Sequence, residues 1–155
     1  MSIFSKEMLM GGDNKFERPN LTANGTMGGS AFAVSASAEL SPNWLAYKAV
    51  DNLGNSYWWA NTDRPTFTFY NPDALNVTEL ILLYESGHKV GPRALYGSND
   101  GSNFTQITMT TSNYGSLGVL CSCATNTAFY KYHRLDFRSA TNMYLDNLKI
   151  TATIQ

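Results

Sequence analysis

The sequence predicts an all-β protein, an antiparallel β-sandwich of about eight short strands. Composition gives the first reason, since 8 Phe, 9 Tyr and 12 Gly accompany abundant Ser, Thr and Asn, while charged residues make up 15% of the chain. This mixture favours strands and turns over helices. The second reason is that short alternating apolar and polar segments recur with turn-forming residues between them. At 155 residues the chain has the length of one domain.

The expected elements follow one another from residue 31 onward. Phe32 and Val34 share one face of a first half-buried strand, and residues 44–50 have the pattern of a short helical turn. Residues 66–70 alternate strictly, whereas residues 80–84 are apolar on both faces, which is typical of a central strand. Further strands are expected near residues 94–96, 105–109, 118–123, 130–137 and 145–154.

The alternation also predicts which side chains face the core. In the last strand Leu148, Ile150, Ala152 and Ile154 share one face, and Lys149, Thr151 and Thr153 share the other. Trp58 and Trp59 are consecutive, so one should face inward and the other outward.

Residues 1–25 show no sustained periodicity and are interpreted as an N-terminal extension that precedes a domain at 26–155. Two alternatives remain open for the extension: a segment that docks on the domain, on a neighbouring subunit or on a larger assembly, or a frayed terminus. The apolar side chains that would dock are Ile3, Phe4, Met8, Leu9 and Met10.

Charge and cysteine usage exclude several classes of protein. The net charge is −1 and the basic residues are scattered, which argues against a nucleic-acid partner. No window is long and apolar enough to suggest membrane insertion, and no signal peptide is visible, so synthesis in the cytoplasm is expected. Cys121 and Cys123 are separated by one residue, which favours two free thiols over a mutual disulfide.

Three segments carry the clearest motif signal. Residues 48–59 (KAVDNLGNSYWW) combine turn formers and oxygen-bearing side chains with two indoles. Residues 97–104 (GSNDGSNF) place a polar turn before an aromatic ring, and residues 130–135 (YKYHRL) form a tyrosine-rich strand. In this order they resemble the discoidin family, which includes the coagulation-factor (F5/8) type C domains and galactose-binding-like carbohydrate modules. The resemblance covers residues 26–154 and implies a jelly roll with ligand loops at one end, in which Arg134 is a buried structural cation.

The resemblance also implies a structural calcium ion in the 48–59 loop. Its ligands would be backbone oxygens of Lys48 and Leu53, the carboxylate of Asp51, and the hydroxyl and carbonyl of Ser56. The closing ligand would be Asn147, where the family usually has glutamate, with the adjacent Asp146 as a substitute. Calcium needs six to eight oxygen ligands, so the missing carboxylate would weaken the site. The alternative is a metal-free loop in which Asp51 accepts hydrogen bonds from turn amides.

Sugar binding needs an exposed aromatic face beside polar side chains that read hydroxyl groups. Three loops supply candidates, although burial of Trp44 and simple solvation of His88 are equally open. The ligand-binding candidates are Trp44, Glu85, His88, Arg93, Asn113 and Tyr114.

These observations lead to the hypothesis of a non-catalytic module that binds cell-surface glycans. The chain lacks the sequence signatures of the common enzyme classes. The absence of an export signal in a family that works outside cells suggests a phage virion component, present in many copies, or otherwise an extracellular protein. The alternative is a structural capsid or tail decoration protein with no sugar ligand.

Overall fold

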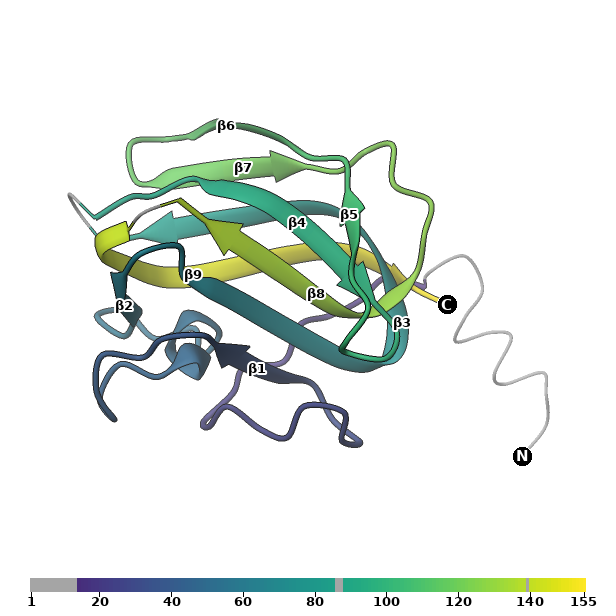
Figure 1. Ribbon diagram of the computed structural model, residues 1–155, viewed down its shortest axis with the longest axis horizontal. Coiled ribbons are helices and arrows are strands. Elements are labelled where there is room, and N and C mark those ends of the chain that lie inside the picture. The colour runs from purple at the N-terminus through teal and green to yellow at the C-terminus, as the bar shows by residue number, and fades with distance from the viewer. Residues whose placement is uncertain (1–13, 86–87, 139) are drawn as a thin grey trace.

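The computed structural model describes residues 14–155 except 86–87 and 139, and it confirms the antiparallel β-sandwich (Figure 1). Nine strands lie in the described part of the chain, against about eight expected. They are β1 (Ala33–Ala36), β2 (Trp58–Thr62), β3 (Thr66–Tyr84), β4 (Pro92–Ser98), β5 (Thr105–Ile107), β6 (Thr110–Tyr114), β7 (Gly118–Ser122), β8 (Tyr130–Phe137) and β9 (Ala140–Ile154).

The two layers share one long strand, β3. Residues 66–70 of β3 pair with β1 and β8, whereas residues 75–84 pair with β9 and β7. One layer therefore has the order β1-β3-β8-β4-β5 and the other β2-β9-β3-β7-β6. The expectation of separate strands at 66–70 and 80–84 is wrong, because the segment containing Asn71 and Pro72 bends the chain from one layer into the other instead of ending the strand. Pro72 has no N–H to donate, and the β3–β8 register shifts at this bend.

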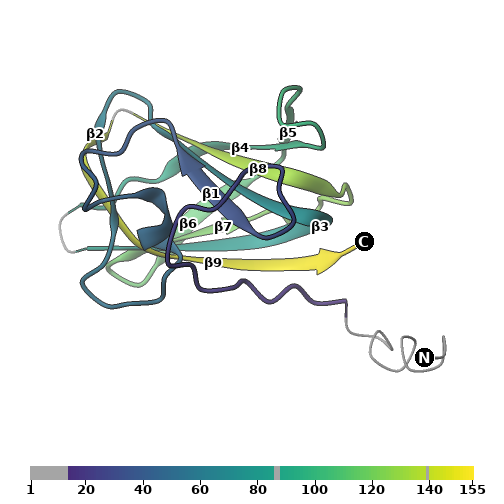
Figure 2. The same ribbon diagram turned by 90° about the horizontal axis from the view of Figure 1, so that it is seen from below.

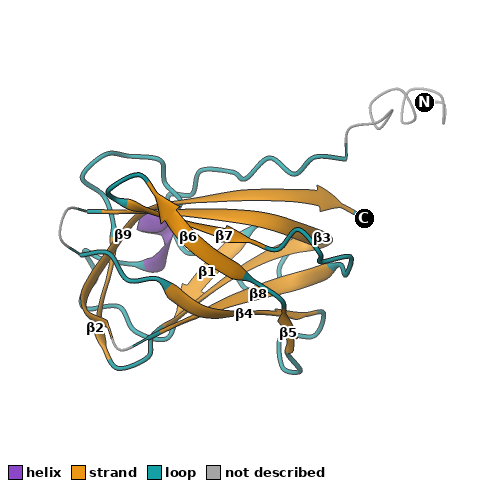
Figure 3. Ribbon diagram, turned by 90° about the horizontal axis from the view of Figure 1, so that it is seen from above, coloured by secondary structure: helices purple, strands orange, loops and turns teal. Residues whose placement is uncertain are grey.

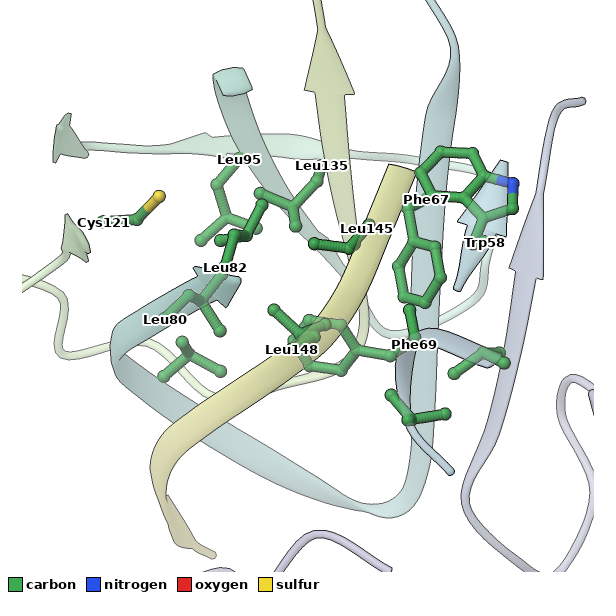
Figure 4. Close-up of a cluster of buried hydrophobic side chains, with 14 of the residues drawn as sticks. Trp58, Phe67, Phe69, Leu80, Leu82, Leu95, Cys121, Leu135, Leu145 and Leu148 are labelled. Atoms are coloured by element: carbon green, nitrogen blue, oxygen red, sulfur yellow. The ribbon is translucent and has the colours of Figure 1, made fainter. Parts of the chain in front are cut away.

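The hydrophobic core lies between the layers, and Figure 4 shows side chains from both meeting there. Residues 80–84 are central, between β9 and β7, but only one face is fully covered: Leu80 and Leu82 are buried while Ile81 and Leu83 are half-buried. In β9 the predicted alternation is confirmed, since Leu148 and Ala152 are buried whereas Lys149, Thr151 and Thr153 are exposed. Trp58 is fully buried against Phe67 and Phe137, and Trp59 is half-buried on the other face of β2, also as predicted.

The core also encloses two thiols and an imidazole. Cys121 and Cys123 are free and buried, as predicted, and burial raises their pKa values to about 12 and about 11. Such thiols are chemically inert in the folded protein. His133 is fully buried with its ring stacked on Phe69 at 4.9 Å between centroids, and burial lowers its pKa to about 3. His133 is therefore neutral at neutral pH.

The helical turn predicted at 44–50 is the 3-10 helix η1 (Ala46–Ala49), drawn in purple in Figure 3. Ala46 and Ala49 are buried, which fixes η1 against the sandwich. No helix in the described part of the chain combines the length and hydropathy needed to cross a membrane.

Residues 14–25, called the N-terminal segment below, run along β9 (Figure 2). The N–H of Phe16 donates to the carbonyl of Ala152 at 2.9 Å, and the N–H of Ile154 donates to that of Asn14 at 2.7 Å. The Phe16 ring is buried and packs on Phe32 at 5.8 Å. This part of the predicted extension is thus packed on the sandwich. The proposed docking side chains Ile3, Phe4, Met8, Leu9 and Met10 lie outside the described residues.

Candidate functional site

The segments that carry the predicted ligand and metal residues meet at one end of the sandwich. Figure 1 shows that the β3–β4 connection, the β6–β7 turn and the connection from η1 to β2 lie opposite the C-terminus of β9. Because antiparallel strands alternate in direction, every second connection lies at the same end of the sandwich, so positions distant in sequence become neighbours there. We call residues 41–57, 88–91 and 113–118 the loop end.

Four rings form an aromatic stack at the loop end: Trp44, Tyr57, Tyr144 and His88. The centroid distances are 4.7 Å from Trp44 to Tyr57, 4.8 Å from Tyr57 to Tyr144, and 3.8 Å from Tyr144 to His88. Trp59 contacts Trp44 and Tyr144 edge-on, at 5.6 and 4.8 Å. All five rings are half-buried. Because each aromatic pair adds about 0.5–1.5 kcal/mol beyond area burial, the stack is a rigid support.

His88 is held at one end of this stack. Its Nδ1 lies 2.9 Å from the carbonyl oxygen of Asn142, and its backbone N–H donates to the carbonyl of Glu85 at 3.1 Å. Glu85 is half-buried beside the stack. Burial, then Tyr144, then the negative charge of Glu85 raise the pKa of Tyr57. His88 is therefore fixed by packing and hydrogen bonding.

A polar groove of about 340 Å³ adjoins the stack at Lys89. The Nζ of Lys89 donates to Oδ1 of Asn113 at 3.1 Å, which connects the β3–β4 loop to the end of β6. The loop predicted at residues 112–117 is therefore strand as far as Tyr114, because this segment pairs with β7. Tyr114, the next residue after Asn113, is 44% exposed. The groove is lined by Lys89, Gly91, Thr111, Ser112, Asn113 and Val119.

The predicted ligand residues thus fall into two neighbouring groups. Trp44 and His88 belong to the aromatic stack, where two tyrosine rings separate them, and Glu85 lies beside it. Asn113 belongs to the groove, whereas Tyr114 and Arg93 are exposed outside its lining. Most other members of these groups were not among the predicted ligand residues. Strand alternation gave a signal for Tyr57, since Tyr57 and Trp59 are two residues apart and share a face. The unpredicted members are Tyr57, Trp59 and Tyr144 in the stack and Lys89, Gly91, Thr111, Ser112 and Val119 in the groove.

The predicted metal loop is closed by hydrogen bonds among its own residues. The carboxylate of Asp51 accepts a hydrogen bond from the hydroxyl of Ser56 at 2.5 Å and another from the N–H of Leu53 at 3.0 Å. Asn147 is adjacent, since its Nδ2 donates to Oδ1 of Asn52 at 3.3 Å. The structure therefore brings Asp51 and Asn147 to the same place, as predicted.

The polar groups around Asp51 are engaged mainly by protein donors. Calcium needs six to eight oxygen ligands. The carboxylate oxygens of Asp51 accept hydrogen bonds from Leu53 and Ser56, and Oδ1 of Asn147 accepts one from Arg18 at 3.4 Å. Oδ1 of Asp146 is buried and has no hydrogen-bond partner among the described residues. Within the described ranges no three acidic, histidine or cysteine side chains gather, so a calcium ion here would depend on backbone carbonyl oxygens.

The other two sequence motifs, residues 97–104 and 130–135, pack against each other. The guanidinium of Arg134 lies 4.9 Å from the Tyr96 ring centroid and 4.5 Å from that of Phe104, and its Nε donates to Asp136 at 2.9 Å. Arg134 is half-buried, and its contacts with the two rings and with Asp136 stabilise the fold. In the turn, Asp100 accepts hydrogen bonds from the backbone of Ser102 and Asn103, which lower the pKa of Asp100.

Comparison with protein-family models finds no match, and neither does comparison with curated protein sequences. Solved structures do match. The F5/8 type C domain of a Bacteroides fragilis protein is 13% identical with a TM-score of 0.66, covering 81% of this chain and 93% of that one. A family 32 carbohydrate-binding module from Clostridium perfringens, in complex with galactose, is 12% identical with a TM-score of 0.63, covering 77% and 93%. Another C. perfringens module, in complex with GalNAc-β-1,3-galactose, is 18% identical with a TM-score of 0.62, covering 79% and 94%.

These structures show that the chain has the discoidin-like, galactose-binding-like fold, as the sequence predicted. The match extends over most of each compared domain, so it includes the sandwich and not a single hairpin.

Proposed function

We propose that this chain is a non-catalytic carbohydrate-binding module and that its glycan site is the polar groove at the loop end. One observation carries the proposal. Lys89 and Asn113 come from two segments that the sequence singled out for ligand contact, and a hydrogen bond joins their side chains. Both lie at the loop end, where stacked rings stiffen the sandwich. Galactose-containing complexes of proteins with this fold support the ligand class.

The chemistry of the groove suits sugar hydroxyl groups. Lys89 has three donors and uses one on Asn113, whose amide nitrogen is a further donor. Thr111 and Ser112 add hydroxyl groups that can donate or accept. Val119 is only 6% exposed, so the apolar surface for the non-polar face of a pyranose would come from the exposed ring of Tyr114, the residue after Asn113. The lining holds no pair of carboxylates such as glycoside hydrolysis employs.

The aromatic stack has a supporting role in this proposal. His88 precedes Lys89 directly and is clamped against Tyr144. Because His88 is fixed, the backbone of the adjacent Lys89 is held in place, so the lysine side chain starts from a set position within reach of Asn113. Trp44 and His88 therefore act by positioning the groove.

Replacing either polar groove residue should weaken glycan binding. Asn113→Ala and Lys89→Ala each remove a hydrogen-bonding group and should raise Kd by about tenfold or more, which corresponds to about 1.4 kcal/mol. The measurement is binding of a multivalent form to a glycan array, followed by titration with the best ligand. Lys149→Ala, an exposed lysine outside the groove, is the matched control and should bind as the unaltered protein does. Equal Kd values for all four proteins would exclude the groove.

We also propose that the module works in many copies, as in a phage virion that adheres to a cell surface. An open groove that holds one or two sugars gives affinities of about 4 to 8 kcal/mol, in the millimolar to micromolar range. Display of several copies converts such weak sites into strong attachment.

A further inference from the structure

Arg18 connects three separate parts of the chain at the predicted metal loop. Its Nη1 donates to the carbonyl oxygen of Val50 at 2.5 Å and to that of Pro19 at 2.9 Å, and its Nη2 donates to Oδ1 of Asn147 at 3.4 Å. The N–H of Leu21 also donates to Val50 at 3.1 Å. The guanidinium thus joins the N-terminal segment, the loop and β9.

Asp51 is the acidic side chain that acts on Arg18, and Asp146 and Glu85 act with it in the same region. Burial lowers the pKa of Arg18 while Asp51 raises it, and an arginine stays protonated under these opposing influences. Burial, then Glu85, then Asp51 raise the pKa of Asp146, whose carboxylate lies near both acids. Arg18 therefore places its positive charge where it offsets a local excess of negative charge.

We propose that Arg18 is a built-in cation of this loop, which takes the role of a divalent ion and lets the loop keep its shape without metal. A calcium ion in such a loop would neutralise a carboxylate, bind carbonyl oxygens and reach a side chain of the last strand. Arg18 binds the carbonyl oxygens of Val50 and Pro19 and reaches Asn147 in the last strand, with its positive charge at Val50, the residue before Asp51. The planar guanidinium suits this position because it holds several donors in a fixed geometry.

The consequence reaches the aromatic stack. Asp51 closes the loop through Ser56, and the next residue, Tyr57, stacks between Trp44 and Tyr144. The N-terminal segment therefore supports the loop end through Arg18, and also through Asn24, whose Oδ1 accepts a hydrogen bond from the N–H of Tyr47 at 2.9 Å. This inference does not depend on glycan binding, because every readout below is a stability measurement.

The first test compares thermal unfolding of the unaltered protein in 1 mM calcium and in EDTA. We expect the two Tm values to agree within about 1 °C. A calcium site with a Kd of 10 μM would raise Tm by roughly 5 to 10 °C under these conditions. A calcium-dependent rise of that size would overturn the proposal. Nothing in this test requires a variant to fold.

The second test removes the guanidinium. Arg18→Gln should lower Tm by roughly 5 °C or more, because carbonyl and amide oxygens lose a charged donor. Arg138→Gln, which removes the same charge at an exposed position, should stay within about 1 °C of the unaltered protein. Equal Tm values for the two variants would contradict the proposal. If Arg18→Gln does not fold, Arg18→Lys keeps the charge and should fold with a smaller loss.

A double substitution separates charge balance from simple packing. Asp51→Asn removes the carboxylate that Arg18 neutralises, so it should lower Tm less in the Arg18→Gln background than in the unaltered protein. Strictly additive losses would show that the two charges do not interact and would overturn the cation role.

Discussion

The free energy of unfolding should fall by about 1.4 kcal/mol for each pH unit below pH 6.5, down to about pH 3, because of His133 alone. Burial lowers the pKa of His133 in the folded protein, whereas the unfolded chain has the ordinary value of 6.5. Above pH 6.5 the imidazole is neutral in both states and the stability is fully present. Below pH 6.5 only the unfolded chain binds the proton, so acid favours unfolding, by about 5 kcal/mol over the whole range.

The surroundings of His133 explain why the folded protein does not take up this proton. The ring stacks on Phe69 and meets the edge of Tyr130 at 6.1 Å. Within the described residues neither ring nitrogen has a hydrogen-bond partner. A charged imidazolium in this place would be buried without compensation.

His133→Phe keeps a flat ring and removes the titration. Denaturant unfolding at pH 7.5 and at pH 4.5 should therefore show a smaller loss of stability in the variant, by about 2 to 3 kcal/mol. His133→Leu serves as a second variant if the larger phenyl ring strains the core. The same pH dependence in both variants and the unaltered protein would assign the acid sensitivity to groups other than His133. Asp146 is not one of them, because its raised pKa makes the folded state bind a proton more readily and so opposes acid unfolding.

Tyr144→Ala should cost about 3 kcal/mol of stability and weaken glycan binding as well. Tyr144 contacts Tyr57, Trp59 and His88, so its removal separates the stack into two parts. Loss of three aromatic pairs and of the buried ring area gives the expected magnitude. Glycan affinity should fall because His88 no longer holds Lys89 in place.

Two controls show whether the loss of stability comes from the packed ring of Tyr144. One removes only its hydroxyl, and the other removes a tyrosine ring that is largely exposed. Tyr144→Phe keeps the ring and should lose less than about 1 kcal/mol. Tyr114→Ala removes a ring that is 44% exposed and should also have a small effect on unfolding. Chemical denaturation of the three variants gives the comparison, and a Tyr144→Ala variant as stable as Tyr114→Ala would show that the stack contributes little.

Local pattern was enough to predict most of the fold. Alternation identified the faces of β2 and β9, and the 97–104 and 130–135 motifs gave the discoidin-like topology. The continuous course of β3 was not predictable in this way. Asn71 and Pro72 are turn formers, and only pairing with both layers makes them a bend inside a strand.

The site was predicted less completely, because its residues are brought together by tertiary contacts. The segments 85–93 and 112–117 were found from their polar residues, but the Lys89–Asn113 contact depends on how β4 and β6 are placed. Tyr144 lay just before the strand expected at residues 145–154, with no local sign of a ring stack. Arg18 belongs to a segment without periodicity, so nothing in the sequence pointed to its place beside Asp51.

The most direct test of the glycan site is an NMR titration of the ¹⁵N-labelled protein with the sugar that the array identifies. The account predicts saturable shifts of backbone and side-chain amides at Lys89, Gly91, Thr111, Ser112 and Asn113, with small shifts in the 98–104 turn at the other end of the sandwich. Saturable shifts that centre on that turn, or no saturable shifts with any sugar, would contradict it.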